Sequence, residues 1–188
     1  MAGEWYALAM NQPPEYCPYC GTGLTQVREP MIHRCESCDD YVFYNPTPGG
    51  SVAVVDGDSL LLVEDFRYDD RWKLPSGRIE VGETMREGAI RELEEETGLS
   101  VEPDALTFFS EEVVEPVEGM HMTNLSFATE RSATTGTVEA GSDATDARFW
   151  TPAEFEASSA SFTDVHARRF GSDSLEWLLD EAKRALES

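Results

Sequence analysis

Lysine is nearly absent from this sequence, since Lys73 and Lys183 are the only two and the other basic residues are arginines. The 188 residues carry 37 acidic side chains against 14 basic ones, a formal net charge of −23. Such a surface repels itself, and a Debye length of about 3 Å in 1 M salt would screen most of that repulsion. We therefore expect a protein adapted to high salt, from a halophile. An acidic face for a basic partner is the weaker alternative, because the acids are scattered along the chain.

Two further absences and the sign of the net charge narrow the class of protein. No apolar run approaches the roughly 20 residues that cross a bilayer, which excludes a membrane-spanning helix. Residues 1–10 show no basic stretch followed by an apolar core, so we expect a cytoplasmic protein without an export signal. The excess of negative charge disfavours nucleic acid as an obligatory partner. The length predicts one main domain and a small appendage.

All four cysteines lie in the first 45 residues, as two C-x-x-C pairs separated by 14 residues. Two such pairs at this spacing predict a zinc ribbon, a closed thiolate site that stabilises a segment too small to form its own hydrophobic core. Two disulfides are the alternative, which the missing export signal disfavours. A structural Zn²⁺ is therefore expected on the four cysteines Cys17, Cys20, Cys35 and Cys38.

The middle of the chain, residues 46–151, alternates like a sheet with one helix, and residues 152–188 are predicted to be helical. The runs 51–55 and 60–63 are rich in β-branched and leucine residues and are joined by a turn of the hairpin kind. Further strands are expected at 106–114, 121–129 and 147–150. Apolar residues at helical spacing predict a helix over 174–186. These elements favour an α+β fold of the α/β/α layered type.

One helix is predicted from its end signals alone. Thr84 and Glu87 form a capping box, and Gly98 stands where a left-handed residue would end the helix, so we expect it to run from Met85 to Thr97. Ala89, Ile90 and Leu93 share the face that can pack on a sheet.

Three glutamates, Glu92, Glu95 and Glu96, share the adjoining face of that helix. Like charges at these spacings repel, and all three lie near the negative end of the helix dipole. A positive partner should offset them, and a hard divalent cation with oxygen ligands fits, above all Mg²⁺. The structural alternative is a solvated acidic face on an acid-rich protein.

The segment 77–99 resembles the Nudix box, a pattern of nine fixed positions at set spacing. All nine are matched here, by Gly77, Glu83, Arg91, Glu92, Leu93, Glu95, Glu96, Gly98 and Leu99. The preceding residues 72–76 resemble the family's lead-in, although Ser76 stands where many members have a second glycine. The resemblance implies a Nudix α/β/α sandwich with a mixed sheet at residues 46–188, preceded by the zinc ribbon at residues 1–45.

The resemblance also implies roles for individual residues. It makes Glu92, Glu95 and Glu96 the ligands of Mg²⁺ or Mn²⁺, with the Ser76 backbone carbonyl as a further ligand. Arg91 and Glu83 become a supporting pair that orients the carboxylates. A further ligand or base is expected in a later strand or loop, where the candidates Glu111, Glu112, Glu115, Glu118 and His121 stay open.

A zinc ribbon before a Nudix box resembles NADH pyrophosphatases and ribbon-bearing ADP-ribose pyrophosphatase-like members. The NADH branch carries a Ser-Gln-Pro-Trp-Pro-Phe-Pro signature after its box, and this chain has none. The first expectation is therefore hydrolysis of ADP-ribose to AMP and ribose 5-phosphate. NADH or nucleoside triphosphate hydrolysis, and a non-catalytic ligand sensor or nucleic-acid-binding regulator, are the alternatives. The partner expected is a small nucleotide, and a homodimer is left open.

Overall fold

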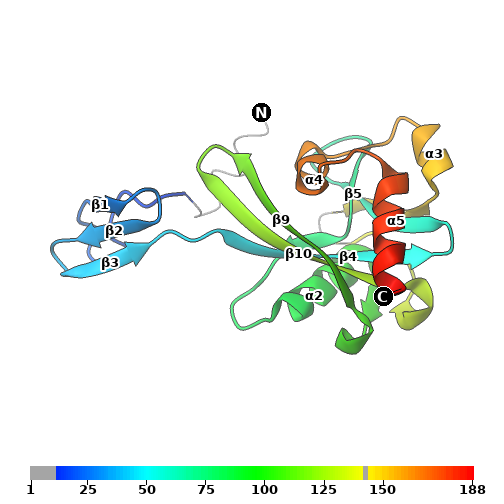
Figure 1. Cartoon of the computed structure of the whole chain (residues 1–188), viewed down its shortest axis with the longest axis horizontal. Coiled ribbons are helices and arrows are strands. Elements are labelled where there is room, and N and C mark those ends of the chain that lie inside the picture. The colour runs from blue at the N-terminus through cyan, green and yellow to red at the C-terminus, as the bar shows by residue number, and fades with distance from the viewer. Residues whose placement is uncertain (1–11, 142–143) are drawn as a thin grey trace. The chain divides into compact units, whose positions relative to one another are not determined.

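The computed structural model describes residues 12–141 and 144–188, so the prediction made from residues 1–10 lies outside the described part. The chain divides into two compact units (Figure 1). The smaller comprises Met1–Thr47 and Glu115–Met122, and the larger comprises Pro48–Val114 and Thr123–Ser188. Within the described residues, no helix is long and apolar enough to cross a membrane.

A three-stranded antiparallel sheet forms the centre of the smaller unit. Its strands are β1 (Thr25–Arg28), β2 (Ile32–Cys35) and β3 (Asp40–Phe43), in the order β1-β2-β3. The turn of a later hairpin belongs to the same unit and is held to it by Tyr44, whose hydroxyl donates to the Gly119 carbonyl at 2.6 Å. The same hydroxyl accepts from the His121 backbone N–H at 3.2 Å.

The larger unit is built on an eight-stranded sheet whose main order is β13-β6-β5-β4-β10-β9, with β12 paired to β5 and β7 paired to β4. The sheet is mixed, because β13 runs parallel to β6 while β12, β4 and β6 run antiparallel to β5. Its strands are β4 (Thr47–Asp56), β5 (Ser59–Asp65), β6 (Arg71–Lys73), β7 (Ser76–Arg78), β9 (Thr107–Val117), β10 (Met120–Glu130), β12 (Ala144–Trp150) and β13 (Ser161–Phe162). A separate pair joins β8 (Leu99–Val101) to β11 (Thr134–Gly136).

Alternation along the central strand divides the core between the two faces of the sheet. On β4, Val52 and Val54 join an apolar cluster with residues of helix α2 (Met85–Thr97), whereas Ala53 and Val55 join a cluster with the C-terminal helices. Those helices are α3 (Pro152–Glu156), α4 (Asp164–Phe170) and α5 (Leu175–Leu186). Helices thus cover both faces of a mixed sheet, which confirms the predicted α+β, α/β/α fold.

Helix α2 has the predicted bounds, Met85–Thr97. The Thr84 hydroxyl accepts from the Glu87 backbone N–H, the Glu87 carboxylate accepts from that of Thr84, and Gly98 has a φ of 69°. The first strand pair is also as predicted, with Asp56 opposite Ser59 across the turn.

The expectation of an all-helical tail was wrong at one place. Ser161 and Phe162 form the short strand β13 beside β6, with Ser161 opposite Arg71 and Phe162 opposite Trp72. The Thr163 backbone N–H donates to the Trp72 carbonyl at 3.0 Å, which extends this edge contact. Two residues are too few to show the alternation that marks a strand in a sequence.

Candidate active site

The C-terminal half of helix α2 carries the glutamates that the sequence singled out. The helix lies against the sheet through buried Ala89 and Leu93, and this packing fixes the direction of the adjoining face that carries the glutamates. Gly50 of β4 makes the close approach possible, because a Cβ there would lie 2.9 Å from the Ala89 Cβ and 3.1 Å from the Met85 carbonyl oxygen.

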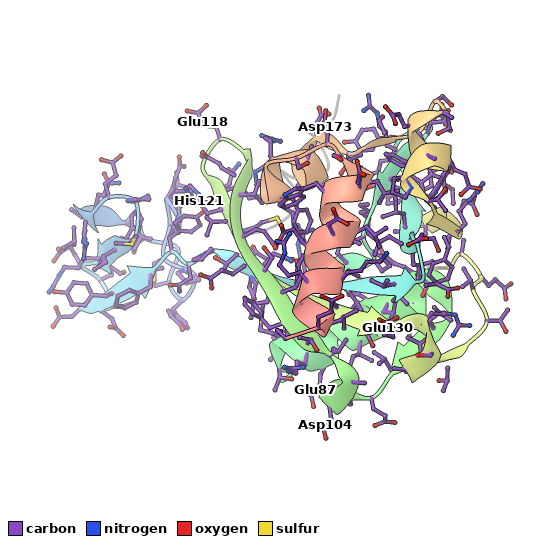
Figure 2. All side chains as sticks on the ribbon, turned by 45° about the vertical axis from the view of Figure 1, so that its right-hand side comes forward. Glu87, Asp104, Glu118, His121, Glu130 and Asp173 are labelled. Carbon is purple, nitrogen blue, oxygen red and sulfur yellow. The ribbon has the colours of Figure 1, made fainter. Side chains whose placement is uncertain are left out.

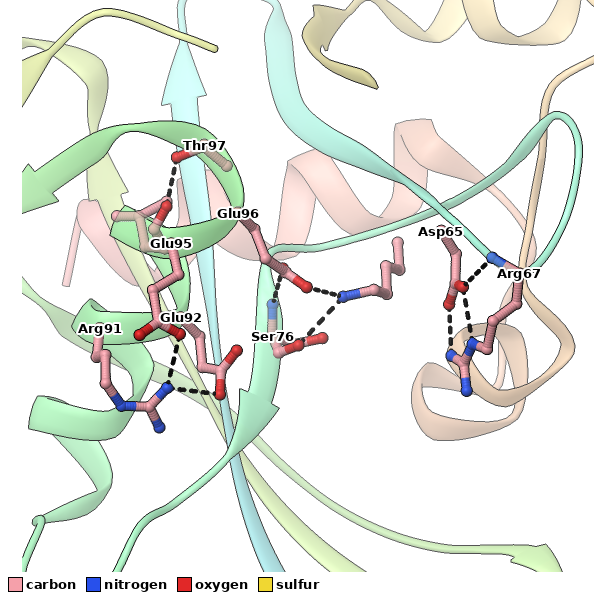
Figure 3. Close-up of polar contacts among 10 residues, drawn as sticks. Asp65, Arg67, Ser76, Arg91, Glu92, Glu95, Glu96 and Thr97 are labelled. Carbon is pink, nitrogen blue, oxygen red and sulfur yellow. Dashed lines mark hydrogen bonds and ion pairs between the residues drawn. The ribbon is translucent and has the colours of Figure 1, made fainter. Parts of the chain in front are cut away.

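Arg91 donates hydrogen bonds to several acidic side chains on and beside helix α2, and Figure 3 shows those to Glu92 and Glu95. Its Nε and Nη2 donate to the two oxygens of Glu83 at 2.8 and 3.1 Å, and Nη2 also donates to the Arg78 carbonyl at 2.8 Å. Its Nη1 donates to Glu92 Oε1 at 2.9 Å and to Glu95 Oε2 at 3.0 Å. Hydrogen bonds from Arg91 lower the pKa of the Glu83 carboxyl. The contact expected between Arg91 and Glu83 is therefore present, and it fixes a guanidinium between two box glutamates.

Glu92 lies close to the β7 backbone. A Cβ added at Gly77 would come within 2.0 Å of the Glu92 Cδ, so only glycine leaves room for this carboxylate in its present position. Burial raises the pKa of the Glu92 carboxyl, while the hydrogen bond and charge of Arg91 oppose that shift. The less polar surroundings thus make Glu92 a better proton acceptor than a carboxylate in water.

Glu96 is the most buried of the three acids, with 1% of its side chain exposed. Its Oε2 accepts from the Ser76 backbone N–H at 2.8 Å, and its Oε1 accepts from Lys73 Nζ at 2.5 Å. The same Nζ donates to the Ser76 carbonyl at 3.1 Å (Figure 3). Lys73 was not among the predicted site residues.

The three box acids are therefore divided between two cationic side chains of the protein. Arg91 holds Glu92 and Glu95, and Lys73 holds Glu96. These two side chains offset the repulsion along the helix.

A buried polar cluster lies on the sheet face that packs against the C-terminal helices. Glu112 and Arg169 form an ion pair at 3.3 Å, with only 2% and 8% of their side chains exposed. The carboxylate also accepts from Ser126 Oγ at 2.9 Å and from Asn124 Nδ2 at 3.1 Å, and Arg169 Nη2 donates to Ser51 Oγ at 3.0 Å. The pair is thus a hydrogen-bonded network, as a buried ion pair requires.

The candidates for a further ligand or base differ in burial and in the compact unit to which they belong. Glu112 is buried in the network just described, and Glu111 is exposed on the same strand. Glu115, Glu118 and His121 belong to the other compact unit, on the hairpin that ends β9 and begins β10. Figure 2 labels Glu118 and His121 on this hairpin. Glu112 is the one candidate among these five that lies in the unit of helix α2 and is also buried.

Two aromatic side chains, Trp72 of β6 and Phe66 just after β5, differ in burial. Trp72 is buried and packs edge-on against Trp150, with ring centroids 5.1 Å apart, so it belongs to the core. Phe66 is exposed. A cavity of about 570 Å³ lies among β13 and the C-terminal helices, lined by residues that include Arg71, Phe155 and Phe162 but none of the box glutamates.

The four cysteines of the smaller unit are brought together as predicted. None forms a disulfide, and their sulfur atoms all lie within 4.8 Å of one another. The Sγ atoms of Cys17 and Cys38 are 3.9 Å apart, and those of Cys20 and Cys35 are 3.5 Å apart. Within residues 12–141 and 144–188, no other group of three or more potential metal ligands lies this close together. Four thiols so arranged can hold a metal ion.

Protonation differs among these thiols. Hydrogen bonding with Thr22 lowers the pKa of the Cys20 thiol to about 6, whereas hydrogen bonding with Cys20 raises that of the Cys38 thiol to about 12. Cys20 thus ionises more readily, and its sulfur opposes the ionisation of Cys38. A bound cation would remove this conflict, because it favours the thiolate form of all four.

Comparison with known proteins identifies the family. A model of the NUDIX domain matches residues 46–170. The chain belongs to the Nudix family. Among curated proteins, this Nudix chain is 32% identical over 103 residues to the NAD-capped RNA hydrolase NudC of Shigella flexneri, and 30% identical over 103 residues to that of Escherichia coli. The matched stretch covers 54% of this chain and 40% of either relative.

Solved structures share the Nudix fold. A NUDIX hydrolase from Nitrosomonas europaea superposes with a TM-score of 0.60 at 19% identity, covering 91% of this chain and 93% of that one. The NUDIX domain of Shewanella oneidensis NrtR, crystallised with ADP ribose, gives 0.55 at 14% identity, covering 77% of this chain and 90% of that one. At these identities the likeness concerns the fold alone.

Proposed function

We propose that the chain is a pyrophosphohydrolase that needs Mg²⁺ or Mn²⁺ and cuts the diphosphate linkage of a nucleoside diphosphate derivative. The observation that carries the proposal is the arrangement of the box. Glu92 and Glu95 share one fixed guanidinium, and Glu96 accepts from the Ser76 backbone N–H. Water would add to one phosphorus as the bridging P–O bond breaks, giving two phosphomonoesters.

The donor set fits a hard divalent cation. Carboxylate oxygens of Glu92, Glu95 and Glu96 and the Ser76 carbonyl are ligands of the type that Mg²⁺ takes from proteins. A positive group is already favoured there, since the Lys73 ammonium lies between the Ser76 carbonyl and Glu96. When bound, the metal would neutralise charge on the diphosphate and make a coordinated water more acidic.

The chain's own side chains would prepare this site. Glu83 and the Arg78 carbonyl hold the Arg91 guanidinium, which in turn sets the direction of the Glu92 and Glu95 carboxylates. Gly77 leaves room for Glu92, which the surrounding protein makes a stronger base. Glu92 is therefore also our candidate for accepting the proton of the attacking water.

We further propose that the four cysteines bind a structural Zn²⁺ and that residues 1–45 act as a zinc ribbon before a Nudix domain of residues 46–188. Zinc–sulfur bonds of about 2.3 Å in a tetrahedron place the sulfurs about 3.8 Å apart. The sulfur separations of 3.5 and 3.9 Å support this assignment. Such a metal would stabilise a three-stranded sheet whose first strand is fully exposed.

ADP-ribose is our first candidate substrate, and its hydrolysis would give AMP and ribose 5-phosphate. Similarity to NAD-capped RNA hydrolases supports a second candidate, the same linkage in NAD(H) or at an NAD-capped RNA end. Both candidates share an AMP half joined through a diphosphate to a second ribose. One site can therefore take either if it recognises the shared half.

A substrate panel tests the proposal. The full chain with Mg²⁺ at high salt would be given ADP-ribose, NADH, an NAD-capped oligonucleotide and nucleoside triphosphates, with products identified by mass spectrometry. Water labelled with ¹⁸O would show which phosphorus is attacked. A preference for nucleoside triphosphates of about tenfold or more in kcat/KM would overturn the substrate assignment and leave the hydrolase.

The variant Glu95→Gln serves as the control for the box, because 49% of the Glu95 side chain is exposed and the fold should tolerate the change. Its activity should fall by about 10²-fold or more if the metal contributes several kcal/mol to transition-state stabilisation. If no compound in the panel is cleaved by the wild type, the chain is not a pyrophosphohydrolase, and a ligand-binding role replaces the proposal.

A further inference from the structure

The two cations at the box are held in different ways. Arg91 is fixed from several sides, by both oxygens of Glu83 and by the Arg78 carbonyl, before it meets Glu92 and Glu95. The ammonium of Lys73 is a point charge at the end of a flexible four-carbon stem. Of the two, Lys73 is therefore the cation that can leave its acid without a rearrangement of the backbone.

Lys73 lies between two oxygens that we assign to the metal. Its Nζ is 3.1 Å from the Ser76 carbonyl oxygen and 2.5 Å from Glu96 Oε1. Only 13% of the Lys73 side chain and 1% of the Glu96 side chain are exposed, so little water screens this contact. Lys73 thus supplies the charge that a buried carboxylate needs.

We infer that Lys73 is a displaceable counter-cation of the box, which stabilises Glu96 in the metal-free protein and must leave Ser76 and Glu96 when a divalent metal binds. The inference rests on the proposed metal site. Mg²⁺ takes its oxygen ligands at about 2.0–2.1 Å in near-octahedral geometry. An ammonium within hydrogen-bond distance of two of those oxygens would share both ligands with the metal and repel it.

Two opposite consequences follow. Lys73 lowers the affinity of the site for divalent metal, because binding includes the loss of its own two contacts. It also protects the metal-free chain, since a buried Glu96 without a nearby positive charge would be costly. Removing the charge should therefore tighten metal binding and at the same time weaken the apo fold, which no purely structural role would do.

The experiment compares Lys73→Met with Lys183→Met in the full, zinc-loaded chain. Lys183 is the only other lysine, and it pairs with Asp58, whose side chain is 94% exposed. Mn²⁺ affinity would be measured by titration with detection of free Mn²⁺ by electron paramagnetic resonance. We expect the Kd of Lys73→Met to fall by about tenfold or more, and that of Lys183→Met to match the wild type.

Thermal unfolding provides the second readout. Metal-free Lys73→Met should melt below the wild type, and saturating Mn²⁺ should narrow or close that gap. An unchanged or weaker Mn²⁺ affinity in Lys73→Met would overturn the inference and leave the proposed function standing. A wild type that binds no Mn²⁺ at millimolar concentration would overturn both.

A measurement on the wild type covers the case in which Lys73→Met does not fold. Selective ¹³C labelling of lysine gives only two ε-carbon signals, from Lys73 and Lys183. The Lys73 signal should move during a Mg²⁺ titration in step with the backbone amides of the box, while the Lys183 signal stays in place. Box amides that respond while both lysine signals stay fixed would overturn the inference.

Discussion

Replacement of Gly77 by alanine tests the position of Glu92 without changing any charge. The added Cβ would lie 2.0 Å from the Glu92 Cδ and 2.2 Å from each carboxylate oxygen. Ordinary carbon contacts are about 3.5–4.0 Å, so the carboxylate must move by roughly 1.5 Å. Gly77 is not among the glycines with a positive φ, so the backbone itself accepts alanine.

The expected effect falls on activity and not on stability. A misplacement of about 1 Å in a catalytic group can cost about 10²-fold in rate, equivalent to about 2.7 kcal/mol in the barrier. The atoms that must yield belong to the far end of a flexible side chain. The fold should therefore lose little, and a glycine-to-alanine change stabilises by about 0.4–1 kcal/mol through the unfolded state where the backbone allows it.

Gly50→Ala is the matched control on the neighbouring strand. There the added Cβ would meet the Met85 carbonyl and the Cα and Cβ of Ala89, which are parts of helix α2 that cannot turn away. This variant should lose stability, by about 1–3 kcal/mol as for other overpacked cores. Melting temperature and kcat/KM for ADP-ribose would be measured for both variants at one salt concentration.

The reasoning about Glu92 would be wrong if Gly77→Ala kept a kcat/KM within about threefold of the wild type. It would also be wrong if that variant melted as early as Gly50→Ala, because the Cβ would then be displacing the backbone and not the carboxylate. A crystal structure of Gly77→Ala would show which of the two moved.

The remaining predictions concern stability. His166 is fully buried, and burial lowers the pKa of its imidazole well below 6.5. As the pH falls through about 6.5, this imidazole therefore takes up a proton in the unfolded chain but not in the folded chain. Stability is highest above that pH and should fall by up to about 1.4 kcal/mol per unit below it, a slope that His166→Phe should reduce in unfolding titrations. Because the net charge is −23, the melting temperature should rise with KCl into the molar range, by ~2–4 °C for each kcal/mol gained; a flat or falling curve would contradict a repulsive origin. Metal analysis should find one zinc per chain, and Cys35→Ser should lose it and unfold the smaller unit, whereas a zinc-free protein with two disulfides would exclude the ribbon assignment.

The sequence predicted correctly the structural features that depend on residues close together in the chain. Helix α2 is predicted by its capping residues Thr84, Glu87 and Gly98, all of which lie within one helical turn of its ends. The hairpin between β4 and β5 depends on a four-residue turn, and the cysteine pairs each depend on a spacing of three. Such features need no knowledge of the tertiary structure.

The sequence did not predict contacts between distant segments. Lys73 meets Glu96 across 23 positions, and Arg169 meets Ser51 across 118. Glu112 is one of four acids between residues 111 and 118, and only the fold buries it beside Arg169. In a chain with 37 acids, a single glutamate carries no signal of burial, so the polar cluster could not be found from composition or spacing.

The short strand β13 has a consequence for the order in which the molecule can be assembled. It pairs with β6, the strand that ends at Lys73, and the Arg71 guanidinium donates to the Ser161 hydroxyl at 2.8 Å. During synthesis, helix α2 leaves the ribosome long before residue 161 does, and N-terminal segments fold first where they can. The nascent chain therefore carries its box glutamates while β6, the strand of Lys73, still lacks its outer neighbour, and that edge of the sheet is completed only once residues 161 and 162 have been translated.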